Sequence, residues 1–330
     1  MIFKYIKNSP LIFVLPALLV GVLSAVLFAS MGEKTGVGLD SDSEETRYWI
    51  DVIQDVGGVA AYQHFDEKYA NKEINFTHDL AHSFGEALYK VEGIDGVSVC
   101  DSNHGFGCYH SFFGWALLDN GLDVITDLDE ACIAVYGEKG LGCQHGIGHG
   151  VLAELGSENL RDSLEACSTL NWQGPVGGCT SGVFMEYNFS SMGTRHLRDY
   201  VPGETHFPCT DVPEKYRQAC YFEQPAWWVQ IVNQDYGAVG KFCAEVEDEN
   251  QREMCYRGAG NVAVGSSAYD IDFVIESCHQ MPDQTGISHC IQGAAWIISA
   301  QKELGDIWQP LCDSLVGEEK EICFNNISFI

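Results

Sequence analysis

The chain has 330 residues, and its 47 acidic and 18 basic side chains give a formal net charge of −29. A nucleic-acid-binding protein needs a basic face to neutralise phosphates, so this composition argues against that class of partner. The same charge disfavours docking onto an anionic lipid surface. Hydrophobic residues make up 46% of the chain, which is enough for a sizeable packed core.

The N-terminal part of the chain predicts a membrane anchor. Residues 1–9 carry two lysines, and residues 10–30 form an uncharged apolar run of 21 residues, the length of a transmembrane helix. The basic flank precedes this run and an acidic stretch follows it, so we expect residues 1–9 in the cytoplasm. The rest of a single-pass protein of the cell membrane would then be extracytoplasmic. A cleaved signal peptide is the alternative, although its apolar core is usually shorter.

Two further regions follow the predicted anchor. Residues 31–45 are rich in Gly, Ser and acidic residues and predict a flexible linker. From residue 46 to residue 330 the apolar residues follow a helical period, with a break expected at Gly57-Gly58. We therefore predict that residues 46–330 form an extracytoplasmic α-helical repeat domain. Three Asn-x-Ser/Thr triplets are candidate glycosylation sites in an exported chain, at Asn75, Asn188 and Asn326.

The 14 cysteines indicate a repeat. They fall into seven consecutive pairs, and from the second pair onward the two members are 11 or 12 residues apart. The first members of successive pairs are 32 to 42 residues apart, a period typical of repeat architectures. The pairs are Cys100/Cys108, Cys132/Cys143, Cys167/Cys179, Cys209/Cys220, Cys243/Cys255, Cys278/Cys290 and Cys312/Cys323.

Each repeat unit has the content of a helical hairpin. An amphipathic run precedes the first cysteine, a polar or glycine-rich turn follows, and a helix of small residues begins at the second cysteine. We predict that every pair is a disulfide between the two helices, each contributing about 2–3 kcal/mol in the chain-entropy model. The fold is therefore predicted to be all-α, with the stapled hairpins stacked into an α-solenoid or α/α superhelix. Glycine lies three residues after the second cysteine in four units, where we expect close helix packing, at Gly146, Gly182, Gly258 and Gly293.

Histidines are concentrated in the first half of the chain, where seven of the 11 lie between His64 and His149. Two pairs have the i, i+4 spacing that places both imidazoles on one helix face, where they can chelate a metal ion. Aligning the pairs places His78 and His145 at equivalent positions, with His110 in the unit between them. Later units have other residues at this position, so the repeat itself does not require histidine: Ser181, Phe222, Arg257, Gln292 and Asn325.

A metal site is the function that this pattern favours. Nitrogen-rich ligand sets suit zinc, copper or iron, and the sequence does not distinguish among these ions. A bound metal that activates water or dioxygen would make the protein a hydrolase or an oxidoreductase, with a carboxylate as proton acceptor. The predicted ligands are His78, His82, His110, His145 and His149, with His104 and Asp79 as further candidates. The candidate proton acceptors are Glu86, Glu154 and Glu186.

Other interpretations of the histidines stay open at this point. They can be hydrogen-bonded packing residues or pH-sensitive groups, in a scaffold that binds a protein or a glycan at the cell surface. The chain can also be an accessory subunit that docks in a membrane complex through its anchor helix. The segment from His78 to Glu86 resembles the His-Asp stretch of the HD-superfamily phosphohydrolases. That resemblance covers nine residues and implies metal binding by His78 and Asp79.

Overall fold

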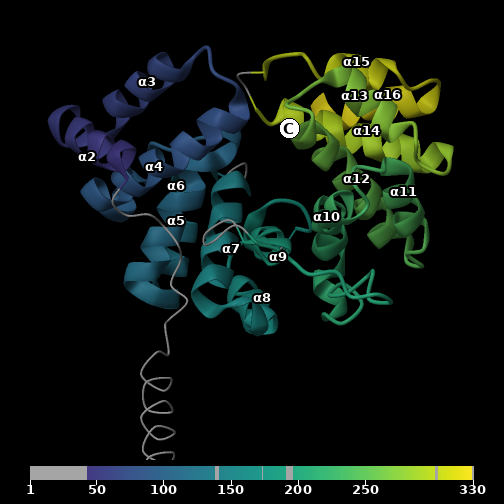
Figure 1. Ribbon diagram of the computed structural model, residues 1–330, viewed down its shortest axis with the longest axis horizontal. Coiled ribbons are helices and arrows are strands. Elements are labelled where there is room, and N and C mark those ends of the chain that lie inside the picture. The colour runs from purple at the N-terminus through teal and green to yellow at the C-terminus, as the bar shows by residue number, and fades with distance from the viewer. Residues whose placement is uncertain (1–42, 138–140, 173, 191–195, 302–303, 329–330) are drawn as a thin grey trace, which may run out of the picture. The chain divides into compact units, whose positions relative to one another are not determined.

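The computed structural model describes residues 43–137, 141–172, 174–190, 196–301 and 304–328 (Figure 1). The predicted cytoplasmic segment, the predicted anchor at residues 10–30 and most of the predicted linker lie outside these residues. Within the described ranges, no helix is long and apolar enough to cross a membrane.

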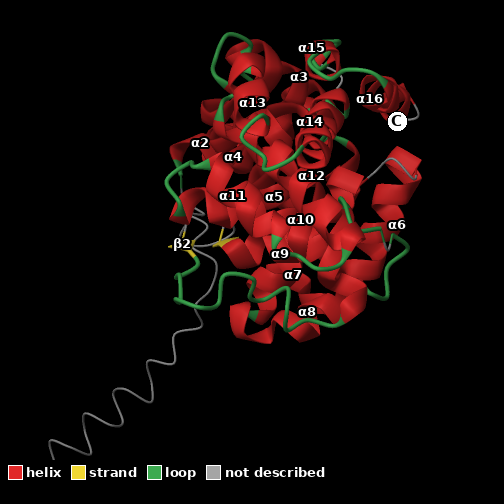
Figure 2. Cartoon of the chain, turned by 90° about the vertical axis from the view of Figure 1, so that its right-hand side faces the viewer, coloured by secondary structure: helices red, strands yellow, loops and turns green. Residues whose placement is uncertain are grey.

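The regular secondary structure of the described part of the chain is almost entirely helical, which confirms the predicted all-α class (Figure 2). One short antiparallel ribbon pairs β1 (Phe189–Ser190) with β2 (His196–Leu197). The helices of the first half are α2 (Glu44–Val56), α3 (Gly58–Tyr69), α4 (Ile74–Glu92), α5 (Gly107–Asn120), α6 (Ile125–Tyr136), α7 (Leu141–Leu155), α8 (Leu160–Cys167) and α9 (Gly178–Asn188). Those of the second half are α10 (Glu214–Ile231), α11 (Tyr236–Ala244), α12 (Glu249–Ser266), α13 (Ile271–Cys278), α14 (Gln284–Ser299), α15 (Gln309–Asp313) and α16 (Glu318–Ser328).

The helix α2, the first in the described residues, begins two residues earlier than the apolar period indicates. The hydroxyl of Ser43 accepts a hydrogen bond from the Thr46 backbone N–H at 2.9 Å, so Ser43 caps the helix. Glu44 and Glu45 therefore belong to the first turn of α2, where acidic side chains are favoured by the helix dipole. The predicted break is confirmed, because Gly57 separates α2 from α3 with a φ of +80°.

All seven predicted cysteine pairs are disulfides, with Cα–Cα distances of 5.4 to 5.7 Å. Cys167 is the last residue of α8 and Cys179 is the second residue of α9, so their disulfide joins one helix end to the next helix start. The cysteine spacing therefore predicts the connectivity correctly.

The second helices of successive units pack side by side in chain order. α4 contacts α5, α5 contacts α7 and α7 contacts α9, and the row continues through α10, α12, α14 and α16 (Figure 1). α5 and α9 are buried along most of their length, and they lack a polar stripe. α8 and α13 are amphipathic and pack with one face on this row. The row thus brings side chains from successive units together.

Glycines set the distance between neighbouring helices of the row. A Cβ atom at Gly182 would collide with the carbonyl oxygen of His145 in the preceding helix. Gly258 and Gly293 make the same approach to the carbonyls of Phe222 and Arg257. The expectation of close packing three residues after the cysteine is therefore confirmed at these positions. Gly146 differs, because it faces the side chains of Phe113 and Tyr109.

The glycine contacts also correct the alignment of the histidine pairs. Gly148, five residues after Cys143, approaches the carbonyl of Cys179 in the next helix. Gly85 makes the equivalent approach to the carbonyl of Cys108, which places Leu80 at the cysteine position of α4.

It follows that His82, and not His78, is equivalent to His145, and that His78 lies one turn earlier. A motif that repeats every four residues can be aligned in two registers, and only the packing selects one of them.

One candidate glycosylation site is not accessible. Asn188 is 1% exposed, and its side-chain amide donates a hydrogen bond to the carbonyl oxygen of Glu223 at 3.2 Å. An attached glycan requires a surface position, so the expectation for this residue is wrong in the folded protein. Asn326 is exposed, in agreement with a surface triplet.

Candidate metal centre

Five histidines from three neighbouring helices, α4, α5 and α7, have their rings in contact. His78 and His82 come from α4, and His145 and His149 come from α7. His110 of α5 lies between the two pairs, with ring centroids 5.2 Å from His78, 5.3 Å from His82 and 4.7 Å from His149. The structure therefore brings together the four histidines of the two i, i+4 pairs and His110, which the repeat position predicts.

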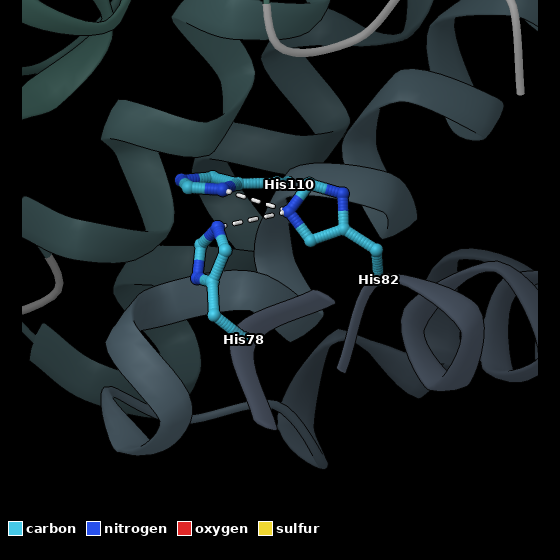
Figure 3. Close-up of side chains that lie close together, drawn as sticks. All are labelled: His78, His82 and His110. Carbon is cyan, nitrogen blue, oxygen red and sulfur yellow. Dashed lines mark hydrogen bonds between the residues drawn. The ribbon is translucent and has the colours of Figure 1, made fainter. Parts of the chain in front are cut away.

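The first group consists of His78, His82 and His110 (Figure 3). Nε2 of His82 lies 3.1 Å from Nε2 of His78 and 3.4 Å from Nδ1 of His110. The three ligand atoms all lie within 4.8 Å of one another. Two nitrogens bound to one tetrahedral zinc ion are about 3.3 Å apart, given zinc–nitrogen bonds of about 2.05 Å. This group can therefore hold a metal ion.

A backbone carbonyl fixes the proton of His78. Its Nδ1 lies 3.0 Å from the carbonyl oxygen of His104, which can only accept, so Nδ1 carries the hydrogen. Nε2 then directs its lone pair toward His82. Metal-binding histidines are commonly oriented by such a hydrogen bond from the second ring nitrogen to a carbonyl or carboxylate.

A turn in the left-handed backbone conformation positions the carbonyl of His104 beside His78. His104, Gly105 and Phe106 have φ values of 54°, 62° and 66°, so three successive residues adopt the conformation that usually favours glycine. A Cβ atom at Gly107 would lie 2.6 Å from the carbonyl oxygen of His78, so the turn packs directly on α4. The imidazole of His104 points elsewhere, with Nε2 2.8 Å from Oδ1 of Asp66. His104 thus contributes its carbonyl to the first group and not its ring.

The second group consists of His145 and His149, with two residues of α9. Nδ1 of His149 lies 2.8 Å from Oε2 of Glu186, which orients the ring so that Nε2 faces His145. The two Nε2 atoms are 3.1 Å apart, and Nε2 of His145 is 3.3 Å from Sδ of Met185. His149 and Glu186 are only 1% and 5% exposed.

Burial and crowding keep two of the rings neutral. Burial lowers the pKa of His110 well below its usual value, and the nearby imidazoles, led by His149, lower it further. Burial followed by the proximity of His149 lowers the pKa of His145 in the same direction. A neutral imidazole offers a lone pair, and this is the form that binds metals.

The remaining predicted site residues have other surroundings. Glu86 is buried, with Oε1 2.5 Å from Nζ of Lys90 and Oε2 accepting from the Thr46 hydroxyl at 3.2 Å. Both of its oxygens are therefore engaged by neighbours that are not ligands. Glu154 and Asp79 are exposed, and neither belongs to the group of His78, His82 and His110. Of the three candidate proton acceptors, Glu186 alone contacts a histidine of these groups in the described part of the chain.

Met185 is not among the residues that the sequence predicts for the site. It lies six residues after Cys179, the position that His149 occupies relative to Cys143. The position of Met185 relative to Cys179 could therefore have identified it as a site residue. The carbonyl of His104 has no such signal in the sequence, because it depends on a backbone turn.

Comparisons with models of protein families, with curated proteins and with solved structures find no match to this chain. The short resemblance to the HD superfamily receives no support from them.

Proposed function

We propose that this chain is a metal-binding protein and that His78, His82 and His110 form its metal centre. The observation that carries the proposal is the convergence of three imidazoles from α4 and α5, with a backbone carbonyl holding the His78 ring in the ligating orientation. Three nitrogen ligands suit zinc, copper or iron and leave a fourth position of a tetrahedral ion for water or another small ligand.

The setting of this centre follows from the rest of the sequence. Seven disulfides favour an oxidising compartment. Together with the apolar run at residues 10–30, they support a protein anchored in the cell membrane, with its helical part outside the cytoplasm. The pairing of successive helices supports a stack of hairpins in the manner of an α-solenoid.

A metal ion at this centre could also catalyse a reaction. An ion with an open position activates bound water or dioxygen, so a hydrolase or an oxidoreductase is the enzymatic form of the proposal. His78 and His82 are half-buried, which leaves this group closer to solvent than the buried His149. Glu86 is a poor candidate for the proton acceptor, because Lys90 and Thr46 already bind its carboxylate.

The experiment measures bound metal in the full-length protein, produced in an oxidising compartment and loaded in turn with zinc, copper and iron. His82→Ala removes the central imidazole, so we expect it to lose one of the ions that the parent binds. His279→Ala is the matched control, because His279 is exposed and does not belong to either histidine group. Circular dichroism and a thiol assay show that each variant is folded and oxidised. Equal metal content in the parent and the His82→Ala variant would refute the proposal.

A further inference from the structure

We propose that His145, His149 and Met185 form a second, separate metal centre that selects monovalent copper. This centre is built on α7 and α9, and none of its ligands belongs to the group on α4 and α5. The proposal for this centre can therefore be tested separately from the proposal for the first centre.

The donor atoms are placed as ligands of one ion. Nε2 of His145 lies 3.1 Å from Nε2 of His149 and 3.3 Å from Sδ of Met185. The nitrogen–nitrogen separation is close to the value of about 3.3 Å expected for two ligands of a tetrahedral ion. A thioether is a weak hydrogen-bond acceptor, so hydrogen bonding alone gives little reason for this approach of sulfur to the imidazole. A soft cation bound by all three atoms explains the short distance between the sulfur and the imidazole better.

Glu186 orients the ring of His149 in this centre. Its carboxylate lies 2.8 Å from Nδ1 of His149 and is buried with it. This contact places the ring proton on Nδ1 and leaves Nε2 as the ligand atom, in a carboxylate–histidine–metal arrangement.

The thioether determines the choice of ion. Sulfur donors without charge favour monovalent copper, whereas zinc prefers thiolate, imidazole or carboxylate ligands. Thiolates do not compete for the ion here, because all the cysteines are in disulfides. The two imidazoles and the thioether therefore bind the ion without competition from a thiolate.

The scaffold holds these donors together through two glycines. A Cβ atom at Gly182 would strike the carbonyl of His145, and one at Gly148 would strike the carbonyl of Cys179. α7 and α9 consequently approach until their backbones are in contact. Met185, almost one turn beyond Gly182, then reaches the ring of His145.

The test titrates the full-length oxidised protein with monovalent copper under anaerobic conditions, in competition with a chromophoric copper chelator. Met185→Leu keeps the volume of the side chain and removes the sulfur. We expect this variant to bind one copper ion about tenfold to a hundredfold more weakly, with little change in zinc binding. Met254→Leu is the matched control, because Met254 is half-buried on α12 and distant in the sequence from the histidines.

X-ray absorption of the copper-loaded protein identifies the ligands directly. The parent and the His82→Ala variant should both show copper–sulfur scattering, and the Met185→Leu variant should not. Scattering from nitrogen and oxygen alone in the parent would overturn the proposal, as would unchanged copper affinity in the Met185→Leu variant. Loss of the sulfur signal in the His82→Ala variant would show that the two histidine groups form a single centre, which also contradicts the proposal. Metal loss in the His82→Ala variant with the sulfur signal intact tests the first centre alone.

Discussion

At the scale of single residues, Glu223 is a carboxylate buried in the helix row outside the histidine groups. It is 3% exposed, and its carboxylate accepts a hydrogen bond from the hydroxyl of Ser181. Burial raises the pKa of Glu223 to about 7, although the hydrogen bond from Ser181 opposes this shift. Ser181 occupies the repeat position of His82, His110 and His145, so a polar side chain follows the last histidine at this position.

Glu223→Gln is expected to stabilise the protein above neutral pH. The folded protein keeps a proton on Glu223 up to a pH of about 7, whereas the unfolded chain releases it above a pKa of about 4.5. The folded state thus binds more protons between these values, and its stability falls as the pH rises through this window. Glutamine removes that loss, which amounts to about 3 kcal/mol at pH 8. Urea unfolding at about pH 4 and pH 8 measures the difference.

The free energy of unfolding of the Glu223→Gln variant should exceed that of the parent clearly at about pH 8 and differ little from it at about pH 4. Glu204→Gln is the control, because Glu204 is exposed and its substitution removes a surface carboxylate. Equal stabilisation by both variants at pH 8 would assign the effect to net charge, and the buried carboxyl would then have no special role.

The sequence predicts the histidine ligands better than their supporting groups. The i, i+4 spacing identifies four of the five rings, because it reports a local helical geometry. The hydrogen bond from His78 to the His104 carbonyl depends on a left-handed turn, and the position of Met185 depends on contact between α7 and α9. Carboxylates are predicted least well. Glu86 forms an i, i+4 ion pair with Lys90 on the same helix, and its prediction as a proton acceptor rests on its distance from the histidines without this competing pairing.

At the scale of the helix, two glycines of α12 should respond to alanine in opposite directions. A Cβ atom at Gly258 would collide with the carbonyl of Phe222, whereas one at Gly265 meets nothing within 4 Å. Gly258→Ala must push α10 and α12 apart, and we expect it to lower the free energy of unfolding by about 2–4 kcal/mol. Gly265→Ala gains helix propensity and should raise it by about 0.5–1 kcal/mol.

Because both substitutions lie in one helix and add the same methyl group, each serves as the control for the other. Denaturant unfolding of the two variants beside the parent gives the comparison. Destabilisation of the same size at both positions would mean that close helix contact is not what selects glycine in this row.

The cysteine spacing predicts the helical hairpins and their disulfides because both are set within one unit of the chain. The register between units is not determined in this way. α4 has no cysteine, and its His-x-x-x-His motif fits the pattern of α7 in two registers. The contact of Gly85 with the Cys108 carbonyl selects one of them, and such a contact joins different units. Local pattern therefore specifies the elements, and packing specifies how they align.

At the scale of the whole molecule, two disulfides of equal loop length should have different consequences. Cys132–Cys143 and Cys312–Cys323 each span 11 residues, so their removal costs about the same chain entropy, about 3 kcal/mol. Cys143 lies in the first turn of α7, two residues before His145, whereas Cys323 lies in α16 at the other end of the row. In a stack where units contact mainly their neighbours, damage stays near the unit that is altered.

Replacing Cys132 and Cys143 together with alanine should therefore loosen α7, while the same change at Cys312 and Cys323 should loosen α16. Native-state hydrogen exchange resolved by peptide measures both effects without reference to any metal. If the proposed centres exist, only the first variant should also bind metal more weakly. Faster exchange in α7 after loss of Cys312–Cys323 would show that the row unfolds as one cooperative unit. A chain of that kind would transmit a change at its C-terminal end to the histidines, whereas a stack of nearly independent hairpins isolates the histidines from it.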